Sequence, residues 1–343
     1  MGFDSLPLWV LLALFAGAGG VILVCGIHLT GQADRIADRT GLGEALVGGV
    51  LLGAATSLSG TVVSVTAALD GRASLAFSNG VGGIAAQTAF LAIADIVYRR
   101  GNLEHVAADV SSLFQCALLM LLLAIPLVAY TTPEITLLGV HPASYALVIV
   151  YGSGLLAQRH VREQPMWRVV NTSETHEDSP DEEQHDLRGN LGLIAGFSAL
   201  MLILASMGWV LAEVAGTLTD RFDLNASLVG ALMTAVVTSL PELVTTLAAV
   251  HRGALQLAIG GIVGGNTFDT LFLTLSDVAY RDGSLYQAVS PQDYFWLAIG
   301  LVMTAVLLLG LLVRQKSGPG GIGFESLSLL GIYGGAIALQ ALG

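Results

Sequence analysis

The chain has 343 residues, of which 54% are hydrophobic and only 12% are charged, and its formal net charge is −12. A soluble domain carries about 25% charged residues, so this composition excludes an ordinary soluble protein. We therefore predict an all-α polytopic membrane protein, and its acidic balance makes nucleic acid an unexpected partner.

Ten apolar stretches can each cross a hydrocarbon core roughly 30 Å thick, which takes about 20 helical residues. In chain order they are 7–28, 43–69, 74–97, 106–130, 136–157, 190–215, 226–250, 254–279, 291–313 and 323–342. The polar segment between the fifth and sixth stretches contains ETHEDSPDEEQHD and lacks apolar periodicity. We predict a first half of five helices at 1–157, an acidic cytoplasmic linker at 158–189 and a second half at 190–343.

The two halves contain copies of one segment. Residues 45–100 align without a gap on residues 227–282 at a shift of 182, and 20 of the 56 pairs are identical. TSLSG at 56–60 falls on TSLPE at 238–242, and VGGIAAQT at 81–88 falls on VGGNTFDT at 263–270. Internal repeats in an apolar chain are typical of secondary transporters with a site at the repeat interface.

The repeat and the loop charges predict the same topology. Five predicted spans separate equivalent points of the two copies, and an odd number places the copies in opposite senses across the bilayer. With both termini outside, the cytoplasmic loops hold eleven basic residues and the outer loops hold only Arg72, Arg221 and Arg281. Positive charge concentrates on the cytoplasmic side, so we predict a 5+5 inverted repeat with N-out and C-out termini.

Acids inside membrane spans cost roughly 2.5–3.5 kcal/mol each on insertion scales, so each needs a reason. Glu242 lies mid-span beside Pro241, which leaves the carbonyl of Val237 without its helical donor. Together with the hydroxyls of Thr238 and Ser239, these groups form a set of hard oxygen ligands within about one turn. Such ligands suit Na⁺, Ca²⁺ or a proton.

The next span adds a second acid. Asp269 and Asn266 are three residues apart and therefore share one helix face. The first copy offers weaker ligands at the matching positions, because it keeps Thr56 and Ser57 but has Gln87 where the second copy has Asp269. We expect a lopsided cation site in which the second half supplies the negative charge.

Three other acids within the spans have less specific settings. Asp95 and Asp277 lie near span ends beside Tyr-Arg pairs, and we expect them to form structural ion pairs. Glu213 lies one span before the predicted site, where it could line an access path or reach the outer surface.

The TSLPE motif is followed about 20 residues later by Gly264, Gly265 and Asn266, and then by the polar residue Asp269. This pattern resembles the α-repeats of the sodium/calcium exchanger family. The resemblance implies that Glu242, Thr238, Ser239 and Asp269, with Thr56 and Ser57 of the first copy, surround a transported cation. Gly60 departs from the family glutamate, Ser59 from its proline, and Gln87 from its Asn or Asp. The resemblance also implies that the first and sixth spans slide to switch access.

The expected function is secondary antiport of Ca²⁺ against Na⁺ or H⁺, and monovalent Na⁺/H⁺ antiport on the same fold is the alternative. A passive channel or an intramembrane enzyme is disfavoured, since no protease motif is present. We therefore expect no enzymatic activity and no cofactor, with cations bound as substrates. The expected setting is a prokaryotic cell membrane, with lipid and inorganic cations as partners and a monomer favoured over a homo-oligomer.

Overall fold

The computed structural model describes residues 3–40, 53, 55–98, 101–164, 166, 167, 169, 170, 190–316, 318 and 322–342. Within them the first half forms α1 (Leu8–Thr40), α3 (Leu58–Leu69), α4 (Ala73–Tyr98), α5 (Leu103–Val106), α6 (Val110–Thr131) and α7 (Pro142–Glu163), after the short helix η1 (Phe3–Ser5). The second half forms α8 (Asn190–Phe222), α9 (Ala226–Leu228), η3 (Val229–Thr234), α10 (Ala235–Thr238), α11 (Leu240–Arg252), α12 (Leu255–Asp269), α13 (Leu271–Ala279), α14 (Leu285–Ala288), α15 (Pro291–Val313) and α16 (Phe324–Leu342).

Each of the ten predicted spans contains a helix. Among the described residues, six helices are long and apolar enough to cross a membrane, and the bent pair 226–238 and 240–252 makes a seventh. Several boundaries differ from the prediction. Helix α1 continues to Thr40 and α8 to Phe222, and α7 begins at Pro142, where the His141 side chain accepts a hydrogen bond from the backbone of Ala143. Most of the predicted linker, 171–189, lies outside the described residues.

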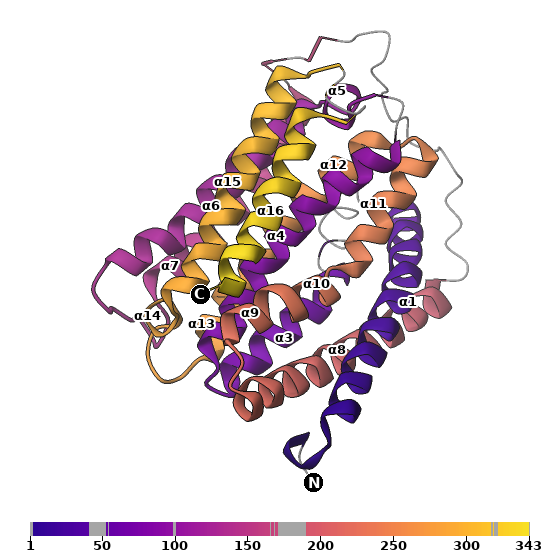
Figure 1. The fold of residues 1–343 in the computed structure, drawn as a ribbon. Coiled ribbons are helices and arrows are strands. Elements are labelled where there is room, and N and C mark those ends of the chain that lie inside the picture. The colour runs from indigo at the N-terminus through magenta and orange to yellow at the C-terminus, as the bar shows by residue number, and fades with distance from the viewer. Residues whose placement is uncertain are drawn as a thin grey trace.

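The shift of 182 residues also relates helices that lie outside the two aligned segments. It carries the first residue of α1 onto that of α8, α4 onto α12, α5 onto α14, and α7 onto α16. Helix α4 lies in the middle of the bundle, while α1 and α8 pack side by side at one edge (Figure 1). The five-helix unit is therefore repeated over the whole of each half.

Matching aspartates join the two halves. Asp95 accepts hydrogen bonds from the backbone N–H groups of Leu103, at 2.8 Å, and Gly323, at 2.8 Å. Asp277 accepts hydrogen bonds from the backbone N–H groups of Leu285, at 3.0 Å, and His141, at 2.8 Å. Each of these donors is the repeat mate of a donor to Asp95, which means that it lies 182 positions away in the sequence. Each half thus holds the start of the other half's last helix.

These contacts correct the expectation of a structural ion pair at Asp277. Asp277 is fully buried and receives a further hydrogen bond from the Ser144 hydroxyl, at 2.7 Å, and no arginine in the described part of the chain forms a salt bridge with it. Arg99, the neighbour expected to pair with Asp95, lies outside the described residues. Backbone donors at buried helix starts need an acceptor, and a carboxylate serves that need here.

Both copies of the central motif break a helix at the same place. Ser239 separates α10 from α11 with φ −93° and ψ 2°, and the two segments around it are bent by 44°. Ser57 precedes α3 with φ −80° and ψ 0°. Because the first copy has Ser59 where the second has Pro241, proline alone does not cause the break.

The charged loops gather at two ends of the bundle. Arg72 pairs with Asp220, at 2.8 Å, and Arg221 donates to the backbone carbonyl of Leu6. The other end of the bundle contains α5, at the top of Figure 1. There Arg314 donates to the carbonyl of His105, at 2.9 Å. Arg72 and Arg221, both expected outside, thus lie at one end of the bundle, and Arg314, expected on the cytoplasmic side, lies at the other.

Replacing Asp277 should destabilise the fold without touching the central acids. Asp277→Ala orphans the buried backbone N–H groups of His141 and Leu285, and each orphaned group costs roughly 1–3 kcal/mol. The apparent Tm of the detergent-solubilised protein should fall by several degrees, whereas Asp282→Ala at an exposed position should leave it unchanged. Equal Tm values for the two variants would contradict a structural role for the Asp277 contacts.

Candidate functional site

A small cavity lies where the two broken helices meet α4 and the α12–α13 junction. Its volume is about 10 Å³, which is near the minimum that holds one water molecule. It can therefore accommodate a single ion of similar size. The lining residues are Ser57, Gly60, Asn79, Gly83, Gln87, Thr238, Ser239, Glu242, Asp269 and Phe272.

The helix breaks position the polar groups of the cavity. Ser57 and Ser239 sit at the breaks themselves, and Glu242 occupies the first turn of α11. The unpaired N–H groups of a helix start favour negative charge nearby. Asp269 is the last residue of α12, so it too stands at an interruption of its helix.

Neutral side chains of the first half donate hydrogen bonds to Asp269 of the second half. The Ser57 hydroxyl donates to Asp269 Oδ1, at 2.6 Å, and Gln87 Nε2 donates to Asp269 Oδ2, at 2.7 Å. Gln87 Nε2 also donates to the Ser239 hydroxyl, at 3.1 Å. Gln87 and Asp269 are repeat mates, as are Ser57 and Ser239. Two repeat mates touch only near the pseudo-two-fold axis, so the cavity lies on that axis.

Glu242 has no comparable donors. Its side chain is buried, and neither carboxylate oxygen has a well-formed hydrogen bond within the described residues, although the Thr56 hydroxyl faces it. Two further acceptors on lining residues, Gln87 Oε1 and Asn79 Oδ1, also lack a partner there. None of the described lining residues is basic. A buried carboxylate in such a place is stable only when a cation or a proton neutralises it.

The structure brings together six of the nine residues expected at the site. Glu242, Asp269, Thr238, Ser239, Ser57 and Gln87 line the cavity, and Thr56 faces Glu242. Asn266 instead donates to the Thr88 hydroxyl, at 3.0 Å, and the carbonyl of Val237, the group expected to be a ligand, accepts a hydrogen bond from the Ser239 N–H. Neither residue is among those that line the cavity. Their ligand roles, like those of the other residues, remain predictions.

Apart from the glycines Gly60 and Gly83, two lining residues were missed by the sequence interpretation. Asn79 donates to the carbonyl of Gly60, at 3.1 Å, and to the Ser64 hydroxyl, at 2.9 Å. An amide within an apolar span was the available signal for it. Phe272 lies in α13, three residues after Asp269, and an aromatic residue in an apolar helix gives no such signal.

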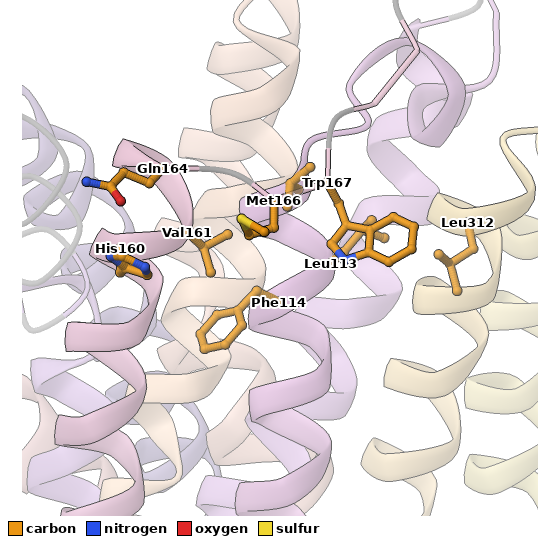
Figure 2. A pocket seen from close by; sticks show the side chains of 9 residues that line it. Leu113, Phe114, His160, Val161, Gln164, Met166, Trp167 and Leu312 are labelled. Carbon is orange, nitrogen blue, oxygen red and sulfur yellow. The ribbon is translucent and has the colours of Figure 1, made fainter.

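A larger pocket lies elsewhere and has a different chemistry. It encloses about 430 Å³ beside α6, α7, the end of α15 and the segment with Met166 and Trp167 (Figure 2). Its described lining is apolar apart from His160 and Gln164 and contains no carboxylate. This pocket therefore does not suit a cation, and the small central cavity is the candidate site.

Comparison with known proteins agrees with the repeat and the fold. The family model described as sodium/calcium exchanger protein matches residues 10–158 and 191–342. The fold resembles the crystal structure of the H⁺/Ca²⁺ exchanger CAX with a TM-score of 0.71 at 10% identity, over 97% of this chain and 86% of that one. It resembles the sodium-calcium exchanger NCX_Mj, soaked with Na⁺ and Sr²⁺, with a TM-score of 0.63 at 16% identity, over 96% and 98% of the two chains.

Two bacterial sequences are similar over shorter stretches. CaxA of Alkalimonas amylolytica, which is named as an antiporter, is 32% identical over 119 residues, 35% of each chain. The inner membrane protein YrbG of Escherichia coli (strain K12) is 27% identical over 115 residues, 33% of this chain and 34% of that one. The similar stretches thus span about a third of the length of these curated relatives.

The two central acids should be separately required for cation binding. Glu242→Gln and Asp269→Asn each remove half of the negative charge of the cavity, so each should weaken cation binding at least tenfold. Isothermal titration of the detergent-solubilised protein with CaCl₂ and with NaCl measures this effect. Glu213→Gln removes a half-buried acid of α8 that does not line the cavity, and it should bind like the parent. Unchanged binding in both cavity variants would place the cation elsewhere.

Proposed function

The chain belongs to the sodium/calcium exchanger family, a family of transporters, and from that premise we propose that it is a secondary active antiporter that moves Ca²⁺ against Na⁺ or H⁺. The observation that carries this proposal is the buried Glu242 carboxylate. It lies with Asp269 in a cavity of single-ion size that has no basic side chain among its described lining residues.

The charge of the cavity explains how two ions could compete for it. Glu242 and Asp269 carry at most two negative charges, which neutralise one Ca²⁺ or up to two monovalent cations. Either kind of ion relieves the cost of burying these acids, whereas an empty, fully charged cavity is costly. Because of this cost, the cavity should switch from one side of the membrane to the other only with an ion or a proton bound. Strict exchange requires this coupling.

Monovalent Na⁺/H⁺ antiport is the second candidate, and Gly60 is the observation that favours it. Calcium takes six to eight oxygen ligands and prefers carboxylates among them. Gly60 occupies the repeat position of Glu242 and supplies no carboxylate. Compared with a cavity that also has a carboxylate at position 60, this cavity should lose more affinity for Ca²⁺ than for Na⁺ or H⁺.

Alternating access would be served by the α1–α8 pair. Each of these helices packs across the interface onto the broken helix of the other half, with a glycine at the contact. A Cβ at Gly26 would lie 2.6 Å from Pro241 Cβ, and a Cβ at Gly208 would lie 2.6 Å from the carbonyl oxygen of Ser59. These glycines are repeat mates, as are the residues they touch. A contact made at a glycine leaves less side-chain bulk for the two helices to pass as they slide.

The bacterial relatives and the apolar helices support a location in a prokaryotic cell membrane. Lipid and inorganic cations are the proposed partners, and no cofactor is required by the proposed cycle. A monomer is sufficient for it, because both repeats that line the cavity belong to one chain.

Transport by the purified protein in liposomes tests the function directly. Vesicles loaded with Na⁺, with acid buffer, or with neither should take up external ⁴⁵Ca²⁺ only when a counter-ion gradient is imposed. Proton movement driven by Na⁺ in the absence of Ca²⁺, followed with an internal pH dye, would instead identify the monovalent antiporter. Uptake that needs no counter-ion and follows only the membrane potential would show a channel and overturn both.

A methyl group at the crossing glycines should slow transport. Gly26→Ala and Gly208→Ala place a Cβ against Pro241 and against the Ser59 backbone, so each should reduce the initial rate of counter-ion-driven flux several-fold. Gly20→Ala on α1 is the matched control, because its Cβ would meet no atom within 4 Å. An equal rate in all three variants would contradict a role for the α1 and α8 crossings in the cycle.

A further inference from the structure

The cavity is asymmetric in shape as well as in charge. A Cβ added at Gly60 would lie 2.9 Å from Cε2 and 3.3 Å from Cζ of the Phe272 ring, and 3.5 Å from the Thr238 hydroxyl oxygen. Contacts under 3.0 Å require the neighbour to move. A side chain at position 60 would therefore project into the cavity through space that the Phe272 ring already occupies.

Two glycines of the first half make room for this ring. Gly60 faces its edge, and a Cβ at Gly80 would lie 3.4 Å from Phe272 Cβ. The repeat mates of these glycines are Glu242 and Ile262, which are both large. Phe90, the repeat mate of Phe272, therefore has no equivalent glycine pair to receive it, and it is not among the residues that line the cavity.

The ring is also supported from behind. Phe268 meets Phe272 edge-to-face with ring centroids 6.5 Å apart, and Tyr151 of α7 meets Phe268 at 6.3 Å. Such edge-to-face pairs are favourable beyond their buried area. Phe272 is itself only 4% exposed. Its position is thus held by packing on both sides.

We propose that Phe272 and Gly60 form one selectivity-determining unit of this site. The ring fills the space of a first-half carboxylate opposite Glu242, so the cavity holds its ion with the two second-half acids alone. This inference rests on the proposed function, because it assigns the ion's place to the cavity that Glu242 lines. It deepens that function by naming the residues that keep a third carboxylate, and hence stronger divalent binding, out of the site.

A four-member variant set tests the unit by Ca²⁺ titration of the solubilised protein. Gly60→Glu alone should bind Ca²⁺ no more tightly than the parent, because Phe272 blocks the new carboxylate. Gly60→Glu with Phe272→Ala should bind Ca²⁺ at least tenfold more tightly, since a third charge can then reach the ion. Phe272→Ala alone adds no oxygen and should give no gain. The matched control, Gly60→Glu with Phe90→Ala, should behave like Gly60→Glu alone.

Folding is monitored for every member by its Tm and its elution as a single species. If Phe272→Ala does not yield folded protein, Phe272→Leu takes its place, because it frees the ring's volume and keeps an apolar side chain. A gain with Gly60→Glu alone that equals the gain of the double variant would overturn the proposal. So would a folded double variant without tighter Ca²⁺ binding.

A separate arm distinguishes this inference from the proposed function. Glu242→Gln is titrated in the parent background with whichever of Ca²⁺ and Na⁺ the parent binds. Unchanged affinity there would refute the cation site itself. Weakened affinity there, with no gain in the double variant, would leave the site standing and refute only the Phe272–Gly60 unit.

Discussion

The arrangement of this molecule depends on two carboxylates buried beside each other without a basic partner. Glu242 and Asp269 line one small cavity, and the described residues around them offer hydroxyls and amides but no positive charge. Burying charge in this way is costly, so the surrounding helices have to supply donors at fixed places. Ser57 and Gln87 supply such donors to Asp269, whereas Glu242 has none of comparable geometry among the described residues.

The pseudo-two-fold relation supplies those donors from the partner half. Ser57 and Gln87 of the first half bind Asp269 of the second, and the site is formed by repeat mates that meet at the axis. The same exchange occurs at the ends of the bundle, where Asp95 and Asp277 each bind backbone groups of the other half's last helix. Neither half completes its own hydrogen bonding alone, so each depends on the other at both the site and the ends of the bundle.

The backbone scaffold is nearly symmetric, whereas the lining of the cavity is not. The breaks at Ser57 and Ser239 have nearly the same backbone angles although only one copy contains proline. Charge is present on one side of the axis, whereas an aromatic ring that fits between two glycines occupies the other side. Under the proposed function, such a lining would set which cation is bound, while the symmetric scaffold would set how access alternates.

The sequence by itself determined the ten apolar spans, the repeat and the two acids, because these are carried by composition and by identity at a constant shift. It also identified six of the lining residues, since polar groups in apolar spans are few. Only the tertiary structure decided that Phe272 packs against Gly60, that Asn266 donates to Thr88, and that Asp277 binds the backbone at His141 instead of an arginine. Each of these contacts joins segments more than 130 residues apart. Local periodicity carries no information about such pairings, which are set by how the two halves pack across the axis.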